Sequence, residues 1–141
     1  MNRLLAIMLI LLAFLSACTE DSGTPIVPND SNMLIKVKNK ADFEVYGLEL
    51  AIRNHSQGSV NADGSKLEKG DELLFEFLDD DFSLEGKGEM TVYILTDSHI
   101  EDNGDRIPLN QKITLDLVRN QELVFELTGE SVSGAELKRV K

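Results

Sequence analysis

The sequence predicts an all-β protein, a small antiparallel β-sandwich of about seven strands. Three observations support this prediction. Apolar and polar residues alternate along much of the chain after Ser31, and turn-forming residues separate the alternating stretches. No stretch of comparable length has the i, i+3, i+4, i+7 apolar spacing of an amphipathic helix. A length of 141 residues is enough for one such domain.

The alternating stretches are expected to be half-buried strands, because successive side chains of a strand point to opposite faces of its sheet. In the second stretch Tyr46 lies on the same face as Leu48, so it is expected in the core. In the fourth, Tyr93 lies on the face opposite Val92 and is free to be exposed. In chain order the stretches are Ile35–Lys38, Tyr46–Arg53, Glu72–Phe77, Met90–Leu95, Lys112–Val118, Glu122–Leu127 and a short edge candidate, Ala135–Val140.

Glycine and asparagine mark the connections between these strands. Turns that need a positive φ are expected at Asp63-Gly64, Lys69-Gly70, Gly86-Lys87-Gly88 and Asn103-Gly104. Arg119-Asn120 is a two-residue gap between two strong stretches, which predicts a tight hairpin. Turn signals at roughly 8–15-residue spacing fit a sandwich whose architecture is similar to that of immunoglobulin or transthyretin domains. A closed barrel is the alternative.

The outward faces of the predicted strands carry opposite charges. Opposite charges on neighbouring strands stabilise a sheet by roughly 0.2–1 kcal/mol per pair, and charges at edges discourage aggregation. We therefore expect structural ion pairs between one lysine-bearing strand and two glutamate-bearing strands. The residues are Lys36 and Lys38, Glu72 and Glu76, and Glu122 and Glu126.

The first 17 residues have the pattern of a secretory signal. Arg3 is their only charge, and an apolar run from Leu4 to Leu15 follows it. This run is shorter than the roughly 20 residues that a membrane-spanning helix needs. The segment Leu15-Ser16-Ala17-Cys18 resembles the lipobox of bacterial lipoproteins, in which leucine and two small residues precede a cysteine.

The resemblance implies a processing route and an address. The Cys18 thiol would receive a diacylglyceryl group, and cleavage would follow between Ala17 and Cys18. In many Gram-negative bacteria the amine of the cysteine then takes a further fatty acid, such as palmitate. Two or three acyl chains make a stable membrane anchor. Thr19 follows the cysteine where an inner-membrane retention signal would have aspartate, so the cell envelope is expected, and the outer membrane if the organism is Gram-negative.

The composition then divides the chain into three parts. Residues 1–17 form the signal peptide, residues 18–31 the lipidated cysteine and a flexible linker, and residues 32–141 the sandwich domain. The linker is rich in Ser, Thr, Asp, Gly and Pro and would span about 20 Å on average, or roughly 45–50 Å when stretched. Loss of Arg3 changes the net charge from −11 to −12, which should repel the domain from anionic headgroups.

Several function classes are disfavoured by the same composition. An excess of 25 acidic over 14 basic residues argues against nucleic acid as a partner. A single cysteine excludes an internal disulfide and a cysteine-based zinc site. His55 and His99 are both expected in solvated loops, and no serine lies in a nucleophile-elbow motif, so no catalytic residue and no enzyme activity are predicted.

Acidic residues are the weak metal candidates. Calcium takes six to eight oxygen ligands, and sandwich loops can supply several carboxylates together. The EF-hand pattern fails, because placing Gly104 sixth puts His99 first and Asn110 twelfth. The candidates are Asp79, Asp81, Asp97, Glu101, Asp102 and Asp105.

We therefore expect a membrane-anchored envelope lipoprotein with a non-catalytic binding or structural domain. Its partner would be another envelope protein, and it would need no cofactor beyond the lipid on Cys18. A calcium- or small-ligand-binding sensor that uses the acidic loops is the alternative.

Overall fold

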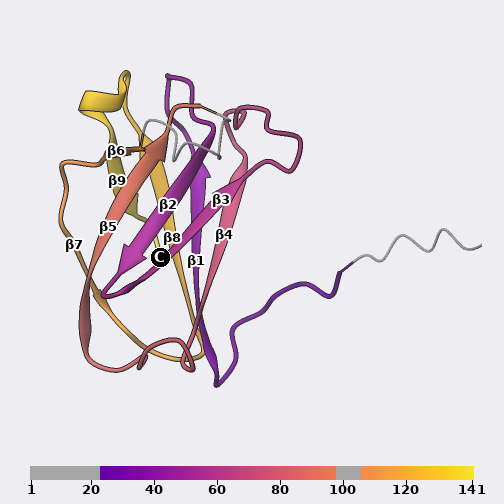
Figure 1. The fold of residues 1–141 in the computed structure, drawn as a ribbon, viewed down its shortest axis with the longest axis vertical. Helices are drawn as coiled ribbons and strands as arrows, with labels where there is room; N and C mark the ends of the chain where they lie inside the picture. Colours follow the sequence, from indigo (N-terminus) through magenta and orange to yellow (C-terminus); the bar gives the residue numbers. More distant parts are fainter. Residues whose placement is uncertain (1–22, 98–105) are drawn as a thin grey trace, which may run out of the picture.

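The structure is a computed structural model that describes residues 23–97 and 106–141. The signal peptide, Cys18 and the Asn103-Gly104 turn lie outside the described residues. Two β-sheets pack face to face as a sandwich, which confirms the predicted all-β class (Figure 1). No helix in the described ranges is long and apolar enough to span a membrane.

Within the described residues the sandwich has nine strands, whereas about seven were expected. One sheet, here sheet A, has the order β4-β1-β8-β9; sheet B has the order β3-β2-β5-β6, with β7 also paired to β5. The strands are β1 (Asn32–Asn39), β2 (Gly47–Ile52), β3 (His55–Val60), β4 (Glu72–Leu78), β5 (Lys87–Leu95), β6 (Arg106–Pro108), β7 (Ile113–Asp116), β8 (Gln121–Thr128) and β9 (Glu136–Arg139).

Three sequence-based expectations about the strands are wrong. The sandwich is not purely antiparallel, because β1 and β8 are parallel, with Ile35 beside Leu123. The polar segments that form β3 and β6 were not predicted as strands. Arg119-Asn120 does not close a hairpin, because β7 belongs to sheet B and β8 to sheet A.

The β7–β8 connection instead carries the chain from one sheet to the other. β7 ends at Asp116, and the backbone N–H of the buried Leu117 donates to Gly86 O at 2.8 Å. Asn120 has a φ of 58°, and its N–H donates to Asn32 O in sheet A at 2.8 Å. The buried Leu117 therefore closes this end of the sandwich, where a hairpin would have left both strands in one sheet.

The apolar core fills the space between the two sheets. Its largest fully buried side chains are three phenylalanines, Phe75, Phe77 and Phe125. The alternation had placed Tyr46 in this core, and that expectation is wrong. Tyr46 precedes β2 and is half-buried, while the neighbouring Val45 is buried. The positive φ values expected in the turns are present at Gly64, Gly70 and Gly86.

Two glutamine side chains bridge the open sides of the sandwich. The Gln57 amide on β3 donates to the backbone oxygen of Glu76 on β4. On the other side, Gln111 donates to Leu137 O of β9 and accepts from Leu137 N, both at 3.0 Å. Each amide thus replaces hydrogen bonds that an edge strand would otherwise leave to solvent.

Gly47 allows β2 and β3 to approach closely. A Cβ atom there would lie 2.5 Å from Val60 Cγ1 and 2.6 Å from Ser59 O. We expect Gly47→Ala to lower the free energy of unfolding by about 1–3 kcal/mol, as overpacking does in other proteins. Urea denaturation measures this change.

Gly58→Ala is the matched control in the same strand pair. The nearest atom to its added Cβ is Leu48 O at 4.0 Å, so the control should keep or raise the denaturation midpoint. Equal midpoints for the two variants would contradict the packing argument.

Candidate functional site

A ladder of ion pairs covers the outer face of sheet A. Lys36 Nζ lies 2.8 Å from Glu122 Oε2, Lys40 Nζ lies 2.7 Å from Glu126 Oε1, and Lys38 Nζ lies 3.7 Å from Glu72 Oε1. The alternation of the strands had predicted opposite charges on neighbouring strands, and these contacts confirm it. Glu76 does not pair with a lysine; it accepts from Asn32 Nδ2 at 2.6 Å.

The central pair of the ladder shifts the pKa of both partners. The hydrogen bond from Lys36 lowers the pKa of Glu122 below its ordinary value, and the same bond raises the pKa of Lys36. Lys141 Nζ lies 3.6 Å from the other carboxylate oxygen of Glu122. Both oxygens of this carboxylate are therefore engaged by lysines.

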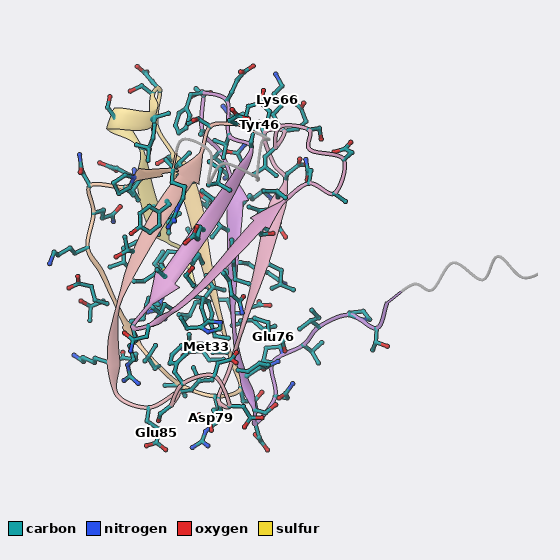
Figure 2. All side chains as sticks on the ribbon, in the orientation of Figure 1. Met33, Tyr46, Lys66, Glu76, Asp79 and Glu85 are labelled. Atoms are coloured by element: carbon teal, nitrogen blue, oxygen red, sulfur yellow. The ribbon has the colours of Figure 1, made fainter. Side chains whose placement is uncertain are left out.

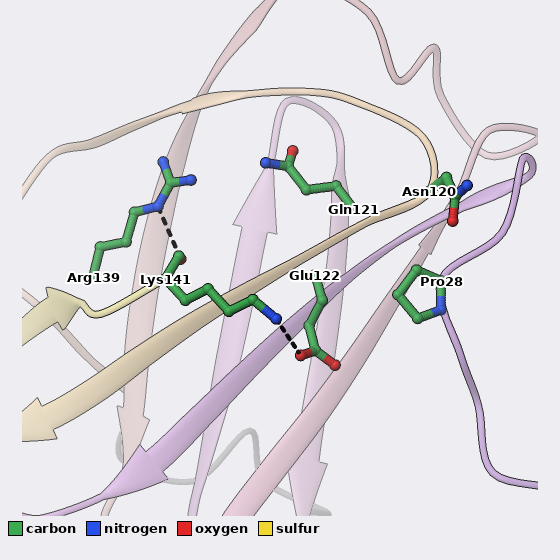
Figure 3. A pocket seen from close by; sticks show the side chains of 6 residues that line it. All are labelled: Pro28, Asn120, Gln121, Glu122, Arg139 and Lys141. Atoms are coloured by element: carbon green, nitrogen blue, oxygen red, sulfur yellow. Dashed lines mark hydrogen bonds and ion pairs between the residues drawn. The ribbon is translucent and has the colours of Figure 1, made fainter.

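An open depression lies beside this pair (Figure 3). Pro28 forms one side, and Arg139 and Lys141 form the other, with Glu122 between them. Arg139 Nε donates to Lys141 O at 3.0 Å. Because the charges around it already satisfy one another, the depression offers no preformed site for a charged ligand.

On the outer face of sheet B, Glu49 holds together a small polar cluster. Its Oε1 accepts from Ser56 Oγ at 2.8 Å and from Arg106 Nη2 at 2.7 Å. The Arg106 guanidinium carbon lies 4.5 Å from the centroid of the Tyr93 ring. Tyr93 is on the expected outer face, but Arg106 occupies its ring, so the ring is no free platform for a ligand.

A cleft lies at the end of the sandwich where β1 finishes, between the segments 41–44 and 66–69. The side chain of Asn39, which is 4% exposed, connects the two segments that line this cleft. The Asn39 amide donates to Leu67 O at 3.1 Å and to Glu68 O at 3.3 Å, and its Oδ1 accepts from Ala41 N at 3.1 Å. Because one buried side chain bonds to both segments, the cleft is rigid.

Two ion pairs span this cleft, here called the distal cleft. Lys66 Nζ lies 3.3 Å from Glu44 Oε1, and Lys69 donates to Asp42. The hydrogen bond to Glu44 raises the pKa of Lys66. The volume is about 250 Å³, which is below the roughly 300–1,000 Å³ of most ligand pockets.

The metal candidates Asp79 and Asp81 lie at the opposite end of the sandwich. Figure 2 shows Asp79 and Glu85 at one end and Tyr46 and Lys66 at the other. Asp79 accepts from Leu84 N at 2.9 Å and from Arg119 Nη1 at 3.1 Å. Asp81 lies 3.7 Å from His55 Nε2.

The remaining metal candidates are not placed beside this pair. Glu101, Asp102 and Asp105 lie outside the described residues, as does His99. Asp97 follows β5, and Leu95, the last residue of β5, pairs with Gly47 at the start of β2. The other end of β2, at Ile52, leads toward Asp79–Asp81, here called the acidic turn. A six-residue strand is roughly 17 Å long, so Asp79 and Asp97 cannot share an ion. No group of three potential metal-ligating side chains occurs within residues 23–97 and 106–141.

His55 is packed rather than solvated, contrary to expectation. It begins β3, and its ring lies 6.0 Å from the Phe77 ring and 5.8 Å from the Phe82 ring, centroid to centroid. No local pattern marks this position, because the rings that His55 contacts belong to residues more than twenty positions away. Cys18 lies outside the described residues, and its expected role stays a prediction.

The fold and these surfaces define a β-sandwich domain with an N-terminal extension at one end and a rigid cleft at the other. No protein-family model matches the chain, and no curated protein matches it either.

The Lys36–Glu122 pair predicts a pH dependence of stability. The pKa of Glu122 is lowered by folding, so its stabilisation is complete above the ordinary pKa of glutamate, about 4.3, and is lost as the pH falls through the folded-state value. Glu122→Gln should therefore cost at most about 1 kcal/mol at pH 7, because the Lys36 side chain is 35% exposed. The cost should shrink as the pH falls below this ordinary value, and it should be gone below the lowered folded-state pKa of Glu122.

Urea denaturation of both proteins between pH 3 and 7 measures the difference. Glu136→Gln is the control, because the Glu136–Lys138 pair is about two-thirds exposed on both sides. A Glu122→Gln cost that does not change with pH would contradict the role of this pair.

Proposed function

We propose that the chain is a membrane-anchored bacterial envelope lipoprotein whose β-sandwich is a non-catalytic binding domain for a protein partner. The anchor is Cys18, within the lipobox-like segment Leu15-Ser16-Ala17-Cys18. The one structural observation that supports the proposal best is the position of the N-terminal extension relative to the distal cleft.

The extension is fastened at one end of the sandwich by Asn32, which is fully buried. Its Oδ1 accepts from Asn29 N at 2.8 Å, and its Nδ2 donates to Val27 O at 3.2 Å. The free tether therefore runs only from Cys18 to about Val27, and it would span roughly 17 Å on average or roughly 30 Å stretched. A tether of this length would keep the domain within roughly 30 Å of the bilayer.

The distal cleft lies at the other end of β1, away from this attachment. β1 runs from Asn32, where the extension is bonded, to Asn39, which frames the cleft. An acylated Cys18 would thus hold the acidic turn near the membrane and present the distal cleft to the rest of the envelope. This arrangement suits a domain that receives a side chain from another envelope protein.

Replacing Cys18 tests the anchor. We expect Cys18→Ser to lose both the acyl groups and the cleavage that follows acylation, because the thioether-forming atom is lost, so the variant should keep residues 1–17. Mass spectrometry of the wild type should find acyl groups on Cys18 and a new N-terminus at that residue. Ser16→Ala, which keeps a small residue in the segment, is the control and should stay anchored. A Cys18→Ser protein that loses residues 1–17, with no acyl group on the wild type, would refute the proposal.

A further inference from the structure

The edges of the two sheets are protected to different degrees. β4 carries Glu72 and Glu76, and Gln57 occupies the backbone oxygen of Glu76. β9 carries three charges, and Gln111 bonds both backbone groups of Leu137. β6 and β7, which share the second edge of sheet B, carry Arg106, Pro108 and Asp116. Charges, proline and capped backbone groups are the usual devices that keep edges from pairing.

β3, the other edge of sheet B, has none of these devices. Its sequence from His55 to Val60 contains no Asp, Glu, Lys, Arg or Pro. Within the described residues it pairs with β2 alone, and no other backbone–backbone hydrogen bond reaches it. β3 is therefore the one edge in the described part of the sandwich that is left open to a further strand.

The geometry of the β2–β3 hairpin shows which backbone groups are available. A two-residue turn, Arg53-Asn54, makes Ile52 and His55 the closing pair. In an antiparallel ladder alternate residues bond to the partner, so the N–H and C=O groups of Ser56, Gly58 and Val60 point outward. Ser56 and Gly58 are exposed and small, so they leave room for an incoming backbone.

A second copy of the chain does not fit this edge if both copies are anchored in one membrane. Antiparallel pairing of β3 with its own copy turns one domain upside down relative to the other. Asn32, where the tether ends, would then lie at opposite ends of the pair. An extended segment of a different protein has no such constraint.

The charges around β3 indicate the chemistry of that segment. Asp81 lies beside His55 at one end, and Asp80 is exposed next to it. Glu49, in register with Gly58 on the neighbouring strand, is already paired with Arg106 and adds no net charge. Glu76 accepts from the neutral Asn32 amide and lies beside Gln57. The whole chain carries a net charge of −11. A basic segment is favoured at such an edge, and an acidic one is repelled.

We propose that β3 is a docking edge that binds an extended, lysine- or arginine-bearing segment of an envelope protein as an additional strand of sheet B. Backbone hydrogen bonds to Ser56, Gly58 and Val60 would hold the segment, in the mode of β-strand addition. The inference rests on the proposed function for the location of the partner, but not for the edge itself.

Site-specific photocross-linking in the native envelope tests this proposal. Benzoylphenylalanine is introduced at Ser56 of the full chain, and at Thr114 on the charged edge as a control. The cross-linked peptide is then sequenced by mass spectrometry. We expect an adduct at position 56, with a peptide that is rich in Lys or Arg, and roughly tenfold less adduct at position 114.

Variants at Gly58 separate docking from folding. Gly58→Pro removes an outward N–H without breaking the β2–β3 ladder and should abolish the adduct, whereas Gly58→Ala should keep it. Gly58→Lys keeps the N–H but adds a charge that repels a basic segment, so it should also lose the adduct. It serves as the test if Gly58→Pro does not fold, as judged by its melting temperature.

Three results would overturn the proposal: no excess of adduct at position 56, an adduct with a second copy of this chain, or an adduct with an acidic segment. A basic adduct at position 56 of a protein without acyl groups on Cys18 would support the docking edge and refute the lipid anchor. The two claims therefore fail separately.

Discussion

The burial of one polar side chain, Asn32, is the constraint on which the arrangement of this protein depends. Asn32 is fully buried, and each of its polar groups has a partner. Its side chain bonds to Asn29 and Val27 in the extension and to Glu76 on β4, and its backbone oxygen accepts from Asn120 before β8. A buried amide without hydrogen-bond partners lowers the free energy of unfolding by roughly 1–3 kcal/mol. The extension, β4 and β8 are thus fastened at one point.

The two ends of the sandwich differ as a result of this fastening. The acidic turn with Asp79 lies where the extension enters, and Arg119 is paired with it. The distal cleft lies at the other end, where a second buried asparagine, Asn39, frames it. One glutamine on each side bridges the two sheets, and within the described residues β3 is the edge strand without charged residues or proline. If Cys18 carries the proposed lipid, a short tether would determine which end of the domain faces the membrane.

The period-two alternation predicted much of the fold because it reports which face of a strand is buried. It placed all seven of the predicted stretches in strands, and it placed Lys36 and Glu122 on faces that meet. It could not identify β3, because its residues His55 to Val60 show no apolar alternation and form a strand only through pairing with β2. The prediction of a hairpin between β7 and β8 was wrong because it depended only on the short gap between the two stretches. The length of that gap does not indicate that Leu117 is buried between the sheets.

The candidate surfaces were harder to predict than the fold for a related reason. The distal cleft depends on hydrogen bonds between Asn39 and Leu67, which are 28 positions apart, and no local pattern announces them. The acidic residues suggested a metal site because they cluster in the sequence, yet Asp79 is engaged by Arg119 and Leu84 instead. Cys18 differs from these residues, because the lipobox-like segment around it is a local motif that can be read without the fold, and its role stays a prediction.

Amide hydrogen exchange can establish whether Asn32 fixes the point at which the tether ends. In the wild type the Asn29 amide is bonded to Asn32 Oδ1 and should exchange slowly. In Asn32→Ala it should exchange roughly tenfold faster or more, and the free energy of unfolding should fall by about 1–3 kcal/mol. An Asn29 amide that exchanges at the same rate in both proteins, with no loss of stability, would show that Asn32 does not fasten the extension.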